Sequence, residues 1–384
     1  MKEERDDPIE SYLKPRLAKF GIALGRGFLP PTDPLTLMPG EFGYLDVFGK
    51  QIPDLLESGN IIQAAKSLPL PSQNALAVLS RAEKDRAMMI YGFGASAVVH
   101  STNPPQTVIP RQIAEPLCRL SNDFGKKPIL SYYSYSSSNW RRINPANDIA
   151  LGNIELLQNF VKAYDEDWFI LVHAAIEKKA ALVVEGGILA ADIAKASNTH
   201  LLWHALSDVS SAIWGMTVVL KRMPEHCSPD VYYKTVRPWI MPFSDVVFEG
   251  VRDDPIKVLR GETGAQSLII PFLVALLGIK HGQTGLTNHL MDMRDYMPPG
   301  HRILVEEMEK ISIIRNLIIK TGFRNLVEIY NECLEMLYEF RALHYEYAIT
   351  YIHKKTDNPE GTGKTPFMEW LKQLMNETLE HKIT

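Results

Sequence analysis

Hydrophobic positions recur with a helical period over most of the chain. Apolar residues return every three or four positions, which places them on one face of an α-helix, whereas two-residue alternation typical of strands is rare. Glycine and proline stand at the joints between the periodic stretches, where helices end. The segments predicted to be helical are 52–99, 111–124, 165–184, 186–222, 265–280, 285–296, 302–320 and 326–352. We therefore expect a mainly α protein.

The pattern also predicts two domains. Residues 1–50 are rich in glycine and proline and are typical of an extended arm packed on a surface. A polar, aromatic segment at 131–138 is followed by a charged turn, and we place a boundary near residue 150. A smaller N-terminal domain (1–150) would then cap a larger helical domain (151–384). The polar segment 353–365 predicts a mobile loop before a short terminal helix.

The longest apolar stripe belongs to the segment 326–352, predicted to form a helix roughly 40 Å long. Its members are Leu326, Tyr330, Cys333, Leu337, Phe340, His344, Tyr347 and Tyr351. His344 is thus a polar residue on an apolar face, and His173 similarly lies inside the apolar run Trp168–Ile176. Burying an imidazole without a partner costs a few kcal/mol, so each ring needs a hydrogen bond, an ion or a cofactor.

Two interpretations of these histidines remain open. Each could be a core histidine bonded to a backbone carbonyl or, for His173, to Glu177. Two such histidines on different helices, in a chain without metal motifs, also suggest a haem site. Haem needs an axial ligand, an apolar slot and a cation for its propionates. Arg341 lies one turn before His344 and is on the correct side to supply that cation.

Composition narrows the class of protein. The chain has 384 residues, 46% hydrophobic and 22% charged, with a net charge of -4, which is typical of a globular protein and argues against a nucleic-acid or anionic-membrane partner. Its three cysteines form neither a disulfide framework nor a metal pair. The charged N-terminus lacks a signal-peptide core, and no apolar run is long enough to span a membrane. We expect a cytoplasmic protein.

Three motifs resemble known sites but lack their context. The run 361–365 ends like a phosphate-binding loop, yet position 358 is Asn358 and a long helix precedes it. The run 92–97 imitates a dinucleotide fingerprint, although prolines follow it closely and a small-residue helix contact fits better. His200 and His204 are four residues apart without a third ligand, which favours a surface role.

Several segments, in order, resemble the indoleamine 2,3-dioxygenase family of haem enzymes, and the resemblance spans nearly the whole chain. The most specific is Asp292–Arg302 (DMRDYMPPGHR). The others are GFLP at 27–30 with Asp33-Pro34, PILSY at 128–132 with Asn139-Trp140, Phe169–Glu177, FEG at 248–250 with GETGAQS at 261–267, Arg341-x-x-His344 with Tyr351-Ile352, and GTG at 361–363.

The resemblance implies a role for each matching position. His344 would be the proximal iron ligand, and His173 would lie at the distal position, where we expect it to hydrogen-bond the indole N–H or, alternatively, only to contact bound O2 or water. The expected haem-side residues are Arg341, Gly261, Glu262 and Thr263. The expected substrate-side residues are Tyr132, Tyr135, Phe169, Ile170, Val251, Arg252, Gly361, Thr362 and Gly363.

Two departures from the family pattern bear on specificity. The family's Gly-Thr-Gly-Gly-Thr has Lys364 in place of its fourth residue. The arginine that binds the substrate carboxylate in the mammalian enzymes has no certain counterpart. Ile256 falls near its position, and its neighbours Arg252, Lys257 and Arg260 are candidates to substitute for it. A further question is whether Arg260 or another cation pairs with Glu262.

The resemblance implies a chemistry. Haem b in its ferrous state and O2 would convert L-tryptophan to N-formylkynurenine, the first step of the kynurenine pathway, in a monomer. Two alternatives stay open: a dioxygenase for another indole derivative in specialised metabolism, and a haem-binding sensor with little turnover.

Overall fold

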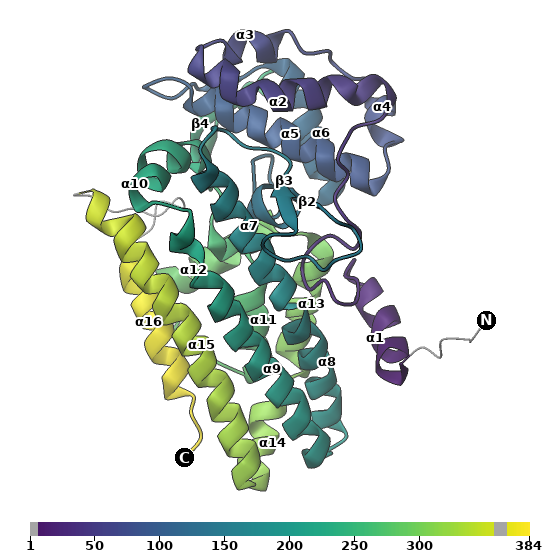
Figure 1. Cartoon of the computed structure of the whole chain (residues 1–384), viewed down its shortest axis with the longest axis vertical. Helices are drawn as coiled ribbons and strands as arrows, with labels where there is room; N and C mark the ends of the chain where they lie inside the picture. The colour runs from purple at the N-terminus through teal and green to yellow at the C-terminus, as the bar shows by residue number, and fades with distance from the viewer. Residues whose placement is uncertain (1–6, 357–366) are drawn as a thin grey trace.

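The computed structural model describes residues 7–356 and 367–384, and it is mainly helical (Figure 1). A group of helices forms the upper part of the molecule in this view: α2 (Gly43–Glu57), α3 (Ile61–Lys66), α4 (Gln73–Ala77), α5 (Arg81–His100) and α6 (Arg111–Phe124). A bundle lies below them: α7 (Tyr164–Lys179), α8 (Ala181–Lys195), α9 (Thr199–Leu220), α11 (Ile269–Leu277), α13 (Pro299–Ile311), α14 (Ile314–Thr321), α15 (Arg324–Tyr351) and α16 (Phe367–Glu380). The predicted mainly α class is confirmed.

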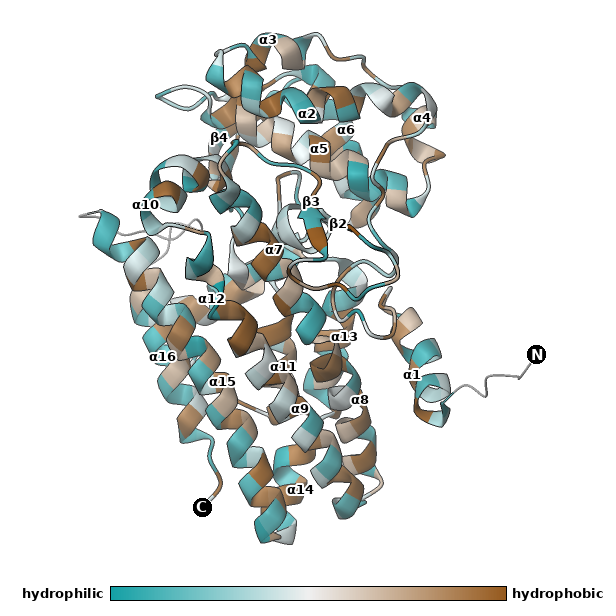
Figure 2. Ribbon diagram, viewed as in Figure 1, coloured by the Kyte–Doolittle hydropathy of each residue, from teal (hydrophilic) through white to brown (hydrophobic). Residues whose placement is uncertain are grey.

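The long helix predicted over 326–352 is α15, and it is central to the bundle. It packs against α9 on one side and α16 on the other, while α9 also packs against α8. Leu326, Tyr330, Cys333 and Leu337 of the predicted stripe are fully buried. In Figure 2 brown and teal residues alternate along α9 and α15, as expected for helices with one apolar face.

Several predicted helical segments are divided in the structure, among them 52–99, which α2, α3, α4 and α5 share, and 165–184, which runs from α7 into α8. The segment 186–222 is not one helix, because α8 ends at Lys195 and Ser197 takes a left-handed φ of 56°. Asn198 then begins α9, since its side chain accepts a hydrogen bond from the Leu201 amide at 3.2 Å. The segment 302–320 is likewise divided between α13 and α14. In the segment 186–222, the cap at Asn198 starts a new helix even though the apolar periodicity continues across it.

The first 50 residues are not wholly extended. Helix α1 (Pro8–Ala18) begins after Asp7, whose side chain accepts from the Ile9 amide, and Pro8 occupies the first helical position, where it is tolerated. Tyr12 of this helix donates a hydrogen bond to Asp192 of α8 at 2.8 Å. This first helix therefore packs on the bundle, whereas farther along the arm the Met38 amide donates to Asp46 of α2 at 2.6 Å.

Short strands connect the two parts of the molecule. They are β1 (Val108–Ile109), β2 (Trp140–Arg142), β3 (Ile154–Leu156), β4 (Phe243–Phe248) and β5 (Ile256–Leu259). Strand β4 lies between β1, to which it is parallel, and β5, to which it is antiparallel, while β2 pairs antiparallel with β3. The boundary near residue 150 stays a prediction.

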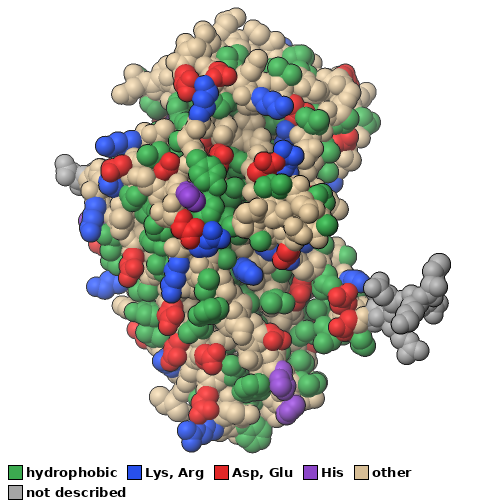
Figure 3. Space-filling model, in the orientation of Figure 1, with side chains coloured by type: hydrophobic (Ala, Val, Ile, Leu, Met, Phe, Trp, Pro, Cys, Tyr) green, Lys and Arg blue, Asp and Glu red, His purple; other side chains and the backbone are tan. Residues whose placement is uncertain are grey.

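The described surface agrees with the modest net charge. On the face shown in Figure 3, acidic and basic side chains are interspersed without a large patch of one sign. His200 and His204 are exposed on α9, as expected for a surface pair. None of the described helices combines the length and apolar character needed to cross a bilayer.

Candidate functional site

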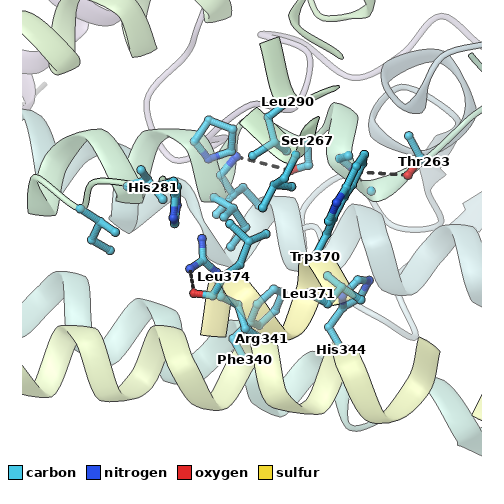
Figure 4. A pocket seen from close by; sticks show the side chains of 18 of the residues that line it. Thr263, Ser267, His281, Leu290, Phe340, Arg341, His344, Trp370, Leu371 and Leu374 are labelled. Carbon is cyan, nitrogen blue, oxygen red and sulfur yellow. Dashed lines mark hydrogen bonds between the residues drawn. The ribbon is translucent and has the colours of Figure 1, made fainter. Parts of the chain in front are cut away.

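A cavity of about 980 Å³ lies within the bundle, large enough for a cofactor together with a substrate. Its walls come from α7, α11, α12 (Gly285–Met293), α15 and α16, and from the segment 262–267. Most of the lining is apolar. Figure 4 shows part of it, with His344 of α15 and Trp370 of α16 at the same end of the pocket as Thr263.

His344 has the properties of a metal ligand. Its side chain is accessible from the cavity, and no described residue hydrogen-bonds to its ring. Burial, and to a smaller extent the nearby His173, lower the pKa of His344 to about 4. The ring is therefore neutral near pH 7 and keeps a nitrogen lone pair free for a metal.

The cavity fits a cofactor that brings its own metal ligands. Among residues 7–356 and 367–384, no three His, Cys, Asp or Glu side chains gather around a point where an ion could sit. A bare metal would thus lack ligands beside His344. Haem supplies four nitrogen ligands itself and needs a single protein ligand in an apolar slot. His344 in this lining meets that requirement.

His173 reaches the cavity from α7, whose first turn carries three acidic residues and whose last turn carries two lysines, as favoured by the helix dipole. Its Nδ1 lies 2.7 Å from the Phe169 carbonyl oxygen. Because a carbonyl only accepts, Nδ1 must donate, and Nε2 of the neutral ring is left as an acceptor. Burial lowers the pKa of His173, which keeps this ring neutral. The hydrogen bond to a backbone carbonyl that is expected of a core histidine is therefore present. Nε2, however, has no hydrogen-bond partner among the described residues.

Aromatic rings enclose His173. The ring of Phe169 is centred 4.5 Å from His173 and 4.7 Å from Tyr232. Tyr132 approaches His173 edge-on at 5.9 Å. Its backbone is fixed by a hydrogen bond of 2.8 Å from its amide to Oε1 of Gln266. These contacts form a flat apolar compartment suited to a planar ring.

The segment 261–267 forms another wall of the cavity. Gln266 also donates through Nε2 to the Gly261 carbonyl at 2.9 Å, which closes the segment into a compact loop. A Cβ at Gly261 would lie 2.3 Å from the Ile240 carbonyl oxygen, so only glycine fits here. Glu262 and Thr263 follow and line the cavity.

Two buried carboxyl groups lie near this wall. Burial raises the pKa of Glu262 to about 8, and no described residue hydrogen-bonds to its carboxyl group. Burial is the sole cause of this rise, and Nε of Arg260 bonds to Asp292 at 3.1 Å. Burial likewise raises the pKa of Glu177 to about 7, although Ser267 donates to its Oε1 at 2.7 Å.

Arg341 lines the cavity but is engaged with α16. Its Nη1 donates to the Leu374 carbonyl at 2.7 Å and to the Thr378 hydroxyl. Nε of this buried side chain has no hydrogen-bond partner within the described part of the chain. Lys280, Arg294 and Arg315 also line the cavity and add positive charge to its α12–α16 side.

Four predicted substrate residues do not line the cavity. Tyr135 is buried and donates to Glu166 at 3.2 Å, and Ile170 lies in the core. Val251 is 45% exposed in a turn, and Arg252 beside it bonds through Nε to the Asp254 carbonyl. Gly361, Thr362, Gly363 and Lys364 lie outside the described residues; of the predicted loop 353–365 only the start is described, where His353–Lys355 form a short 3-10 helix.

Sequence reasoning missed a buried arginine. Arg237 is 8% exposed and lies over the Tyr233 ring at 5.4 Å. Burial raises the pKa of the cavity residue Tyr232, and the charge of Arg237 opposes that rise, so the two side chains are close. In the sequence, Arg237 is only a single arginine within the aromatic run 232–240. No spacing to other residues there indicates a binding site.

The fold and the pocket thus define a helical protein with a histidine-bearing cavity suited to haem. A sequence profile of the indoleamine 2,3-dioxygenase family matches residues 16–358, and the chain belongs to this family of haem-iron dioxygenases.

Three named relatives are similar to this chain over almost their full lengths. The chain is 27% identical to human indoleamine 2,3-dioxygenase 2, covering 95% of each protein. It is 27% identical to 6-hydroxytryptophan 2,3-dioxygenase of Fusarium equiseti, covering 96% of this chain and 98% of that one. It is also 26% identical to a myoglobin of Haliotis madaka, covering 94% and 98%.

Proposed function

We propose that the protein uses haem b, in its ferrous state, and O2 to convert L-tryptophan to N-formylkynurenine. The observation that carries this proposal is the placement of two neutral histidines, His344 and His173, on different helices facing one cavity. When bound, haem supplies the redox chemistry that adds both oxygen atoms across the indole C2–C3 bond and breaks it.

The chain's own residues hold and orient the reactants. His344 would ligate the iron from α15. Nε2 of His173 would accept the indole N–H, while the rings of Phe169 and Tyr232 enclose the indole. Holding two reactants in register and excluding water is how such a pocket accelerates a reaction.

Arg237 is our candidate for the substrate carboxylate. It is buried beside the cavity residue Tyr232, whereas Arg252 and Lys257 lie exposed at the surface. A guanidinium in a desolvated position binds a carboxylate through paired hydrogen bonds.

Product analysis tests the proposal. Haem-loaded, reduced protein is mixed with L-tryptophan in air, and mass spectrometry should find multiple turnovers to a product carrying two added oxygen atoms. His344→Ala should bind far less than one haem per chain, lose the native Soret band and form no product. Normal haem content in His344→Ala would contradict the ligand assignment.

Two relatives justify alternative outcomes of the same experiment. The Fusarium relative is named for 6-hydroxytryptophan, so product from a substituted indole but not from L-tryptophan would move the enzyme to specialised metabolism. The Haliotis relative is named a myoglobin, so bound haem without turnover of any indole would favour a haem-binding protein that is not an enzyme.

A further inference from the structure

Glu262 is a buried acid without a counterion. It is 4% exposed, it lines the cavity, and its carboxyl group has no hydrogen-bond or ion-pair partner among the described residues. Its backbone is held close to Ile240, since its amide donates to the Ile240 carbonyl at 3.1 Å and a Cβ at the preceding Gly261 would lie 2.3 Å from the same oxygen. The side chain therefore stays at the cavity wall rather than turning to solvent.

Among residues 7–356 and 367–384, the groups whose pKa values respond to Glu262 are phenols, and no cation contributes to the pKa of Glu262. Burial chiefly, with a further contribution from the Glu262 carboxyl, raises the pKa of Tyr132, Tyr135 and Tyr232, which places these side chains around it and keeps them neutral. The nearest basic residue along the chain, Arg260, forms an ion pair with Asp292.

Glu177 makes a useful comparison. It too is buried, but Ser267 donates to its Oε1 and it does not line the cavity, although its Oε2 has no partner among the described residues. Nothing equivalent explains Glu262. Because a buried charge is strongly destabilising unless paired, a ligand that brought a positive charge to Glu262 would gain a charge-assisted hydrogen bond that the protein itself does not supply.

We propose that Glu262 is a specificity-determining residue that binds the ammonium group of an amine-bearing indole. This inference rests on the proposed function and adds the residue that selects amino substrates over their deaminated analogues. A cation is favoured over a neutral donor because only a cation neutralises the carboxylate. A site built for a charged group rejects an analogue lacking it, since the carboxylate is then left unpaired.

The test compares L-tryptophan with indole-3-propionate, which differs by the absence of the amino group. Binding is followed through the ligand-induced Soret change of the ferric haem protein, and turnover through kcat/KM. In Glu262→Gln the preference for L-tryptophan should fall about 10- to 100-fold, the range of one charge-assisted hydrogen bond. Glu380→Gln removes an exposed carboxylate from the lining on α16 and should leave the preference unchanged.

The unmodified protein provides a second measurement. Since the pKa of Glu262 is about 8, its affinity for L-tryptophan should rise as pH increases towards 8, where the carboxyl ionises and the amine stays protonated. Affinity for indole-3-propionate should not rise. Glu262→Gln should remove the difference between the two ligands.

The outcomes separate the two proposals. A preference unchanged in Glu262→Gln, at normal haem content, overturns the role of Glu262 while the proposed function stands. If Glu262→Gln fails to take up haem, the unmodified protein decides. In that case, equal pH profiles for L-tryptophan and indole-3-propionate overturn the role of Glu262. If no indole perturbs the Soret band of the unmodified protein, both proposals fail.

Discussion

Single residues in this pocket owe their chemistry to burial. The same desolvation that keeps His344 and His173 neutral raises the pKa of Glu262, because it disfavours whichever form is charged. For His173, one backbone bond to Phe169 further decides which nitrogen is the acceptor. A single neighbour thus converts a core-like histidine into a directed hydrogen-bond acceptor.

Substitution of His173 tests that acceptor. His173→Ser should lower kcat/KM for L-tryptophan about five- to tenfold, through a higher KM, a lower kcat or both. One neutral hydrogen bond contributes about 1 kcal/mol, which corresponds to this change. The 1-methyl analogue, which lacks the indole N–H, should be affected much less. Steady-state kinetics checks both, and unchanged constants for L-tryptophan would remove the proposed bond.

At the scale of elements, close helix packing holds the cavity walls in place. Helix α8 contacts α11, whose Val274 and Ala275 line the cavity. A Cβ at Gly187 of α8 would lie 2.6 Å from the Phe272 ring of α11, so the contact requires glycine. The periodicity identified these segments as helical but carried no information about which of them touch.

A pair of glycine substitutions tests this contact. Alanine is the better helix former, so at Gly215 of α9, where a Cβ meets nothing closer than 3.9 Å, Gly215→Ala should stabilise the protein by up to about 1 kcal/mol. Gly187→Ala should instead destabilise it by about 1 to 2 kcal/mol through overpacking. Urea unfolding measures both, and equal effects at the two positions would contradict the packing argument.

For the whole molecule, buried carboxyls tie stability to pH. Burial raises the pKa of Glu166 and Glu262 to about 8 and that of Glu177 to about 7. Each pKa lies above its value of 4.5 in the unfolded chain, so the folded state binds more protons. The stability these groups contribute is complete below about pH 4.5 and is lost as pH rises through 7 to 8.

In the haem-free protein each such carboxyl should therefore contribute a loss of unfolding free energy between about pH 7 and pH 8, by up to about 1.4 kcal/mol per pH unit. Buried histidines with lowered pKa values, and Lys126, whose pKa burial lowers to about 8, change stability in the opposite direction, so the effect of Glu262 is read from the difference between variant and unmodified protein. Urea unfolding at several pH values should show a smaller loss in Glu262→Gln than in the unmodified protein. An identical loss would mean that Glu262 is already ionised in the folded state.

The sequence by itself determined the helical class, the span of α15 and the two histidines in apolar surroundings, because these follow from local periodicity and the cost of burying an imidazole. Its ordered motifs also led to the family that the profile match confirms. Monomeric state and cytoplasmic location stay predictions.

Tertiary structure alone decided the rest. It placed Arg237 beside Tyr232 and left Glu262 without a counterion, although both residues are unremarkable in the sequence. It also made α16 a wall of the cavity and directed Arg341 towards that helix. The physical reason is common to all of these: burial and pairing depend on side chains brought together from distant parts of the chain, which no local period encodes.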